Sequence, residues 1–145
     1  MKNIKIILVG AAAVVVIFGI FNSLDNKNEN KDIEPTSLYS QLNEEGAVTV
    51  AVTPERDSTD NGKWNFEVVL DTHSVELNED LVQATILLDS YGKEYKPITW
   101  DGDPAGGHHR KGFLRFESVS PLTPSVELKV RDVGGVSERT FKWPL

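Results

Sequence analysis

The chain has 145 residues, of which 39% are hydrophobic and 26% are charged, and this length and composition are typical of one folded domain. Its 22 acidic and 15 basic residues give a formal net charge of -7, which repels phosphate backbones and excludes sequence-independent binding to nucleic acid. The absence of cysteine excludes disulfides, thiolate nucleophiles, iron–sulfur clusters and cysteine-ligated zinc. Any metal site must therefore be built from histidine and carboxylate side chains.

The first predicted element is an apolar N-terminal helix. Residues 6–21 form an uninterrupted run of 16 apolar or glycine residues, and as a helix the wider stretch 4–24 is long enough to cross a hydrocarbon core of about 30 Å. Bulky side chains near its end argue against cleavage as a signal peptide. Lys2 and Lys5 precede the run and acidic residues follow it, which orients the N-terminus toward the cytoplasm. We therefore predict a signal anchor at 1–24 that crosses the cell (inner) membrane once, with the rest of the chain extracytoplasmic.

The next segment, 25–45, is predicted to be a linker. It holds six acidic residues against two lysines and contains few apolar side chains. Such a composition buries too little apolar surface to offset the conformational entropy of the chain. We expect a largely disordered acidic tether, with a short turn of helix around 37–42.

The remaining residues, 46–145, show the two-residue alternation that is typical of strands. It predicts strands at 48–52, 64–70, 82–88, 93–100, 113–116 and 126–131. Pro97 indicates an edge position, and Gly134-Gly135 favours a primed turn whose second arm carries Phe141 and Trp143. About seven short strands without a helical period predict an all-β fold, an immunoglobulin-like antiparallel β-sandwich, with a small barrel as the alternative. The tryptophans and most phenylalanines are expected in its core.

All three histidines fall in two segments of this domain, 70–74 and 100–112. If the second strand continues past residue 70, Asp71 and His73 share its outward face, because side chains two residues apart point the same way. His108 and His109 follow two glycines, whose backbone freedom would let both imidazoles turn toward one point. The segment that holds them is expected to be a loop first and a strand afterward.

Three imidazoles completed by a carboxylate or water match the ligands that Zn(II) or Cu(II) accepts. A carboxylate here would act as a ligand or as the acceptor that orients a ring. The candidate metal ligands are His73, His108, His109, Asp71 and Asp101.

Two other interpretations of the same segment need no metal. In the first, the loop is simply ordered: Asp101 or Asp103 pairs with Arg110, and the histidines hydrogen-bond backbone carbonyls. In the second, His109, Arg110 and Lys111 form a cationic patch for a carboxylate or an anionic envelope polymer. Arg110 and Asp103 are therefore candidate ligand-binding residues.

Three stretches carry a resemblance: Leu-Asp-Thr-His-Ser-Val-Glu-Leu at 70–77, Trp-Asp-Gly at 100–102, and Gly-Gly-His-His-Arg-Lys-Gly-Phe-Leu-Arg-Phe at 106–116. Together they resemble a group of small, uncharacterised, membrane-anchored or secreted prokaryotic proteins with a β-sandwich-like domain. The resemblance covers 48–143 in outline and is most specific at Gly-Gly-His-His-Arg. It implies export and this fold, and it implies no activity.

Catalysis is not expected from these residues. Ser74 and His73 are neighbours that would face opposite ways in a strand, and the chain has no G-x-S-x-G, H-E-x-x-H or phosphate-binding glycine sequence. We predict a membrane-tethered extracytoplasmic binding or accessory module, not an enzyme, whose histidine-rich loop end binds Zn(II) or Cu(II) and whose partner is a protein or envelope polymer. The alternatives are a structural envelope or protein-interaction domain without metal and, less favoured, a metallohydrolase.

Overall fold

The computed structural model describes residues 38–56, 62–119 and 123–145. The chain divides into two units, Met1–Asp32 and Ile33–Leu145, and all described residues belong to the second. The anchor predicted at 1–24 and residues 25–37 of the predicted linker lie outside the described residues. Within those residues, no helix has the length and apolar character needed to cross a membrane.

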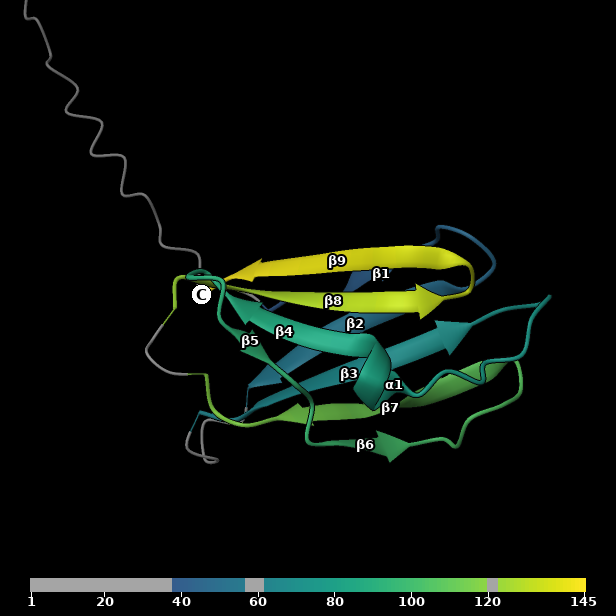
Figure 1. Ribbon diagram of the computed structural model, residues 1–145, viewed down its shortest axis with the longest axis horizontal. Helices are drawn as coiled ribbons and strands as arrows, with labels where there is room; N and C mark the ends of the chain where they lie inside the picture. The colour runs from purple at the N-terminus through teal and green to yellow at the C-terminus, as the bar shows by residue number, and fades with distance from the viewer. Residues whose placement is uncertain (1–37, 57–61, 120–122) are drawn as a thin grey trace, which may run out of the picture. The chain divides into compact units, whose positions relative to one another are not determined.

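The described chain is an all-β fold with two antiparallel sheets (Figure 1). Its elements are β1 (Gln41–Asn43), β2 (Thr49–Arg56), β3 (Trp64–Asp71), α1 (Leu81–Ala84), β4 (Thr85–Asp89), β5 (Glu94–Tyr95), β6 (Thr99–Gly102), β7 (His109–Phe116), β8 (Ser125–Val133) and β9 (Val136–Pro144). The first sheet has the order β1-β2-β3-β7-β6 and the second has the order β5-β4-β8-β9. The all-β prediction is confirmed, and within the described part the two sheets are separate rather than joined as the alternative barrel.

The core lies between the two sheets, because the alternating inward side chains of each are apolar. β3 alternates between buried and half-buried residues along its whole length, as its sequence predicts. Trp143 of the second sheet contacts Phe66 of the first with ring centroids 5.5 Å apart, and Phe116 meets Phe66 edge-on at 5.6 Å. The expected core role of the aromatic residues is thus confirmed for these three, which are essentially buried.

The predicted strand at 82–88 is wrong in its first half and in its phase. Asp80 caps a single turn of helix, α1, by accepting hydrogen bonds from the backbone N–H groups of Val82 and Gln83. This turn shifts the strand that follows by one residue, and such a shift exchanges its two faces. Leu87 therefore points into the core opposite Leu128, whereas the alternation of Val82, Ala84, Ile86 and Leu88 in the sequence predicts that Ile86 and Leu88 point inward.

The single edge strand predicted at 93–100 is two strands in different sheets. β5 pairs with β4, whereas β6 pairs with β7. Pro97 lies in the crossover between them, where its missing N–H costs no ladder hydrogen bond. The strand predicted at 113–116 is longer than expected, since β7 starts at His109.

The folded domain extends into the segment that was predicted as a linker. Residues 41–43 form β1, not a turn of helix, and pair with β2. The Gln41 side chain also bonds the backbone of Lys142 on β9, donating to its carbonyl at 2.6 Å and accepting from its N–H at 3.3 Å. β1 therefore connects the edges of both sheets, and the predicted boundary at 46 is too late.

The two ends of the described domain are distinct. At one, which we call the terminal end, the indole N–H of Trp143 donates to the carbonyl of Tyr39, and Leu145 bonds Pro124. At the other end, which we call the loop end, four connections between strands lie together: 44–48, 72–80, 103–108 and the turn Gly134-Gly135. That turn has φ of 60° and 81° at its glycines, which confirms the predicted primed turn. β3 spans from one end to the other.

Candidate functional site

The two histidine-bearing loops are hydrogen-bonded to each other at the loop end. The N–H of Thr72 donates to the carbonyl of His108 at 3.0 Å, and Leu77 exchanges bonds with the glycine pair, donating to Gly107 and accepting from Gly106. Both glycines have positive φ, as the ordered-loop interpretation expected, at 113° and 70°. The loops thus form one backbone-bonded unit.

Each of two histidines lies beside its own carboxylate. His109 and Asp71 are directly opposite each other in the β3–β7 register, and Nδ1 of the imidazole lies 3.2 Å from Oδ2 of the carboxylate. For His108, Nε2 lies 3.9 Å from Oε1 of Glu76. β3 ends at Asp71, so His73 lies in the loop after the strand and not on the strand itself.

Of the five predicted metal ligands, the structure brings Asp71 and His109 together. In the part of the chain that the structure describes, no group of three or more histidine, aspartate or glutamate side chains lies close enough to hold a metal ion. Asp101 is bonded to Arg115, with 2.7 Å between Oδ2 and Nη2. The carboxylate of Asp103 accepts the backbone N–H of Lys111 at 2.8 Å.

Arg110 is buried, only 3% exposed, and cannot present its charge to a ligand in solution. Its Nη1 donates to the carbonyls of Leu77 and Glu79, at 3.1 and 2.8 Å, and its guanidinium lies 5.6 Å from the ring centre of Trp100. Burial lowers the pKa of Arg110, against the opposing effect of the nearby Glu79 carboxylate. The expected ion pair between Arg110 and Asp101 or Asp103 is absent from the described contacts, because the side chain points inward.

The proposed cationic patch is likewise not formed. Of its three members, Arg110 is buried, and Lys111 lies 2.7 Å from the Glu67 carboxylate. Hydrogen bonding to Glu67 raises the pKa of Lys111, so Lys111 keeps its positive charge, and the Glu67 carboxylate beside it balances that charge. Only His109 remains, and it faces Asp71.

The Trp-Asp-Gly and Gly-Gly-His-His-Arg-Lys-Gly stretches build a tight corner of the first sheet. Gly102 and Gly112 are paired across β6 and β7, and a Cβ on either would collide with the other's Cα and with the ring of Trp100. The indole N–H of Trp100 donates to the carbonyl of Asp103 at 2.7 Å. The glycines let the indole lie over the strand pair, and Arg110 then lies near its ring.

Arg139 is a second buried arginine, which sequence reasoning missed. It is 1% exposed and donates to Asn43 Oδ1 and to the carbonyls of Val133, Glu45 and Val48 at 2.6 to 3.1 Å. Burial lowers its pKa, against the opposing carboxylates of Glu45 and Glu79. The alternation of β9 carried the signal, because position 139 shares the inward phase of the two aromatic residues that end that strand.

Glu79 acts electrostatically on both buried arginines. Its Oε1 accepts the N–H of Gly134 at 3.4 Å, and its Oε2 is buried without a hydrogen-bond partner in the described contacts. We interpret Glu79 as the carboxylate that offsets the two buried positive charges. A buried charge without such compensation is strongly destabilising.

A surface hollow of about 490 Å³ lies beside these loops. It is lined by Gly46, Ala47, Thr49, Asp71, Thr72, His73 and Ser74. The hydroxyl of Thr72 is engaged, since it donates to the carbonyl of Ala47 at 2.6 Å. Asp71 and His73 are thus the ionisable side chains that this hollow offers to a ligand.

Comparison with protein-family models, with curated proteins and with solved structures gives no match for this chain. The resemblance to small exported prokaryotic β-sandwich proteins therefore stays a prediction. Function must be inferred from the geometry and chemistry of the chain itself.

Proposed function

We propose that the chain is a membrane-tethered, extracytoplasmic binding module with an immunoglobulin-like β-sandwich, and that it meets its partner through the loop end. The predicted anchor at 1–24 would supply the membrane attachment, and the acidic segment after it would supply the tether.

The strand order supports the immunoglobulin-like assignment. In constant-type immunoglobulin domains, strands A, B, E and D form one sheet and C, F and G the other. Reading β2 to β9 in chain order as A, B, C, C′, D, E, F and G gives the neighbours A-B-E-D and C′-C-F-G, which are the observed sheets. β1 is then an additional edge strand beside A.

The observation that carries the binding proposal is that the chain enters the domain opposite the loops. Leu38 and Tyr39 lie at the terminal end, next to Trp143. β3, with eight residues, spans the domain, and at about 3.3 Å per residue that is about 25 Å. A tether joined ahead of Leu38 leaves the loop end as the part of the domain farthest from the attachment point, which suits it to meet a partner.

The chemistry of the loop end favours a cationic partner. Its three longer loops carry six carboxylates and no lysine or arginine: Glu44, Glu45, Glu76, Glu79, Asp80 and Asp103. Even when the buried Arg110 and Arg139 are counted against these carboxylates, the loop end keeps an excess of negative charge. Electrostatic complementarity raises the association rate and the specificity for a basic protein segment.

Among the versions of this proposal, the geometry favours the one without metal. Asp71 with His109, and Glu76 with His108, use separate carboxylates in separate pairs, so a shared zinc or copper site would require both loops to rearrange. Metal binding and metallohydrolase activity remain predictions, and a zinc and copper titration tests the metal binding that both require.

The test is an amide NMR titration of the fragment 33–145 with hexalysine, a cationic probe. We expect the shifts to concentrate at the loop end and to weaken at high salt. The variant Glu44→Gln/Glu76→Gln should lower the affinity, whereas Glu55→Gln/Glu117→Gln, with two carboxylates outside the loops, should lower it less. Shifts centred on the terminal end, or equal losses in both variants, would refute the proposal.

A further inference from the structure

A second hollow, of about 270 Å³, lies where α1 and β4 meet β5 and β8. It is lined by Gln83, Ala84, Thr85, Ile86, Glu94, Lys96 and Arg131. These residues are different from those that line the hollow beside Asp71 and His73. The two cations are notable because the chain as a whole is acidic.

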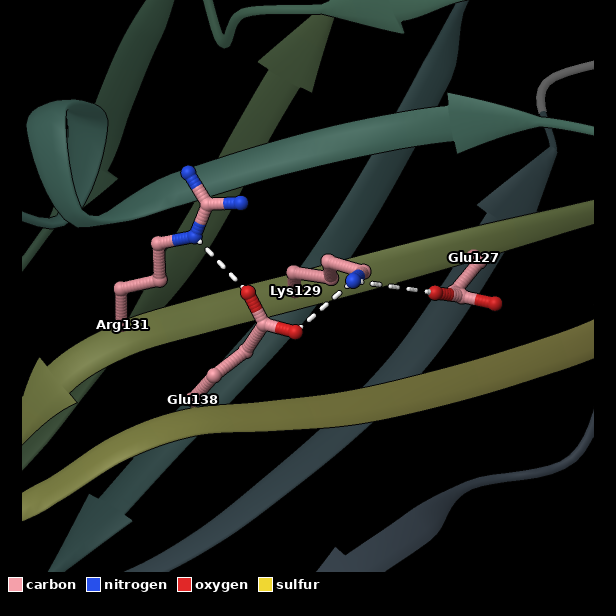
Figure 2. A network of polar contacts seen from close by, with 4 residues as sticks. All are labelled: Glu127, Lys129, Arg131 and Glu138. Atoms are coloured by element: carbon pink, nitrogen blue, oxygen red, sulfur yellow. Dashed lines mark hydrogen bonds and ion pairs between the residues drawn. The ribbon is translucent and has the colours of Figure 1, made fainter. Parts of the chain in front are cut away.

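Arg131 is held in a fixed orientation by a four-residue network on β8 and β9 (Figure 2). Its Nε donates to Oε2 of Glu138 at 2.9 Å, and Oε1 of Glu138 accepts from Lys129 at 2.7 Å. Lys129 also lies 3.6 Å from Glu127. Hydrogen bonds from Lys129 and Arg131 lower the pKa of Glu138, which keeps this carboxylate ionised as an anchor.

The bond through Nε leaves the terminal amino groups of Arg131 unused in this network. Figure 2 shows both terminal nitrogens pointing away from Glu138 and toward β4. Two parallel N–H groups at this spacing match the two oxygens of a carboxylate. The fork is therefore oriented before a ligand arrives, which lowers the entropic cost of binding.

The surroundings of Arg131 select one side for an anion. On one side lies a hollow lined by the carboxylates of Glu79, Asp80 and Asp132, which repel negative charge. On the other side lies Lys96, which is exposed and has no ion pair among the described residues. The apolar residues that line the same hollow are Ala84, which is half-buried, and Ile86, which is 6% exposed.

We propose that this hollow binds a monocarboxylate, which pairs with the terminal nitrogens of Arg131 and with Lys96 while its apolar part contacts Ile86. Glu94 also lines the hollow, and it disfavours ligands with two negative charges such as phosphate. The ligand is either a small organic acid or the C-terminal carboxylate of a peptide, which share this chemistry.

The test uses the full-length chain in detergent micelles and N-acetylalanine as the probe, measured by calorimetry or by NMR. We expect saturable binding at millimolar concentrations and none with N-acetylalanine amide, which lacks the charge. Arg131→Gln and Lys96→Gln should each weaken binding, the first by about tenfold. Arg131→Lys, which keeps the charge and loses the fork, should also weaken it.

Lys142→Gln is the matched control, because Lys142 is an exposed cation on β9 of the same sheet. This variant should bind N-acetylalanine with the affinity of the wild type. Tighter binding of N-acetyl-Ala-Ala than of propionate would identify peptide termini as the ligands, and the reverse would identify small acids. Equal binding of acid and amide, no saturable binding, or unchanged affinity in Lys96→Gln and Arg131→Gln would overturn the proposal. An equal loss of affinity in Lys142→Gln and Arg131→Gln would also overturn the proposal, because the binding would then be unspecific charge attraction.

Discussion

Two buried arginines determine how the loop end is held. Arg139 bonds the 44–48 loop and the β8–β9 hairpin, and Arg110 bonds the 72–80 loop to the start of β7. Each guanidinium donates to two or more backbone carbonyls at this end. Glu79 offsets the charge of both. The polar residues that make this end look like a reactive site are thus largely engaged in holding it together.

Replacing Arg139 should therefore destabilise the domain severely. Arg139→Met keeps the bulk and leaves the carbonyls of Val133, Glu45 and Val48 without their donor, at an expected cost of about 3 kcal/mol. The free energy of unfolding of the fragment 33–145 in urea measures this. Lys142→Met, at an exposed position, should change it by less than about 0.5 kcal/mol. Equal effects of the two substitutions would show that Arg139 has no special role.

Part of the candidate site could be predicted at this scale. Clustering of Asp71 with a histidine followed from the sequence, but the partner is His109 rather than His73. Contacts across a sheet depend on strand register, which two separate segments do not reveal. The burial of Arg110 was detectable, since it shares the inward phase of Leu114 and Phe116 on β7.

At the scale of elements, short local devices decide where strands start and end. The Asp80 cap shifts β4 by one residue, and Pro97 divides a predicted strand into β5 and β6. A single capping residue is too short a signal to compete with a two-residue alternation that continues through it. The longer strands β3, β8 and β9 were predictable because their alternation has no such interruption.

The corner between β6 and β7 depends on its paired glycines. Gly112→Ala would place a methyl group against Gly102 and the ring of Trp100, and such overpacking should cost about 2 kcal/mol or more. Gly135→Ala is the control, because Gly135 has positive φ, at 81°, but no atom lies within 4 Å of its added Cβ. Thermal unfolding should show a larger loss for the Gly112 variant, although Gly135 alone carries the backbone strain. The opposite order would contradict the proposed packing.

The β4–β5 turn should make stability depend on pH. Burial opposes ionisation of Asp89, but bonds from the N–H groups of Lys93 and Tyr91 and from the hydroxyl of Tyr95 outweigh it and lower its pKa below the usual 3.8. Because the folded state then binds fewer protons than the unfolded one, this stabilisation is present above about pH 4 and is lost as pH falls through the lowered pKa.

Asp89→Asn should accordingly reduce stability at neutral pH and flatten its decline under acid. The urea midpoint of the fragment 33–145, measured from about pH 6 to about pH 3, tests this. Glu117→Gln, at an exposed position, should keep the slope of the wild type. A parallel decline of Asp89→Asn and wild type would exclude Asp89 as a source of the pH dependence.

At the scale of the whole domain, β1 makes the sandwich complete. It extends the first sheet and reaches β9 of the second through Gln41, while Tyr39 accepts the indole N–H of Trp143. Composition alone assigned these residues to a linker. β1 has only three residues, and its one leucine, Leu42, points outward, so the segment shows no strand-like alternation of apolar and polar residues. The all-β class and the core were predictable since they depend on many strands together.

Shortening the domain to the boundary first predicted should expose the role of β1. The fragment 46–145 lacks the bonds from Gln41 and to Tyr39, and it loses the partners that Asn43 and Glu45 offer Arg139. We expect a midpoint in urea well below that of the fragment 33–145, with fraying of β9 in amide hydrogen exchange. Equal stability of the two fragments would mean that β1 does not contribute to the stability of the domain.

The most direct test of the central claim, that the histidine loops are a structural binding end and not a metal centre, is a zinc and copper titration. It uses the fragment 33–145 without a histidine tag, together with His73→Ala and His108→Ala. Because no three histidine or carboxylate side chains of the described residues lie close enough to hold a metal ion, and His108 lies beside Glu76, we expect no stoichiometric site that both substitutions abolish. Binding of one metal ion per chain, lost in both variants, would contradict the claim and establish a shared metal site at the loop end.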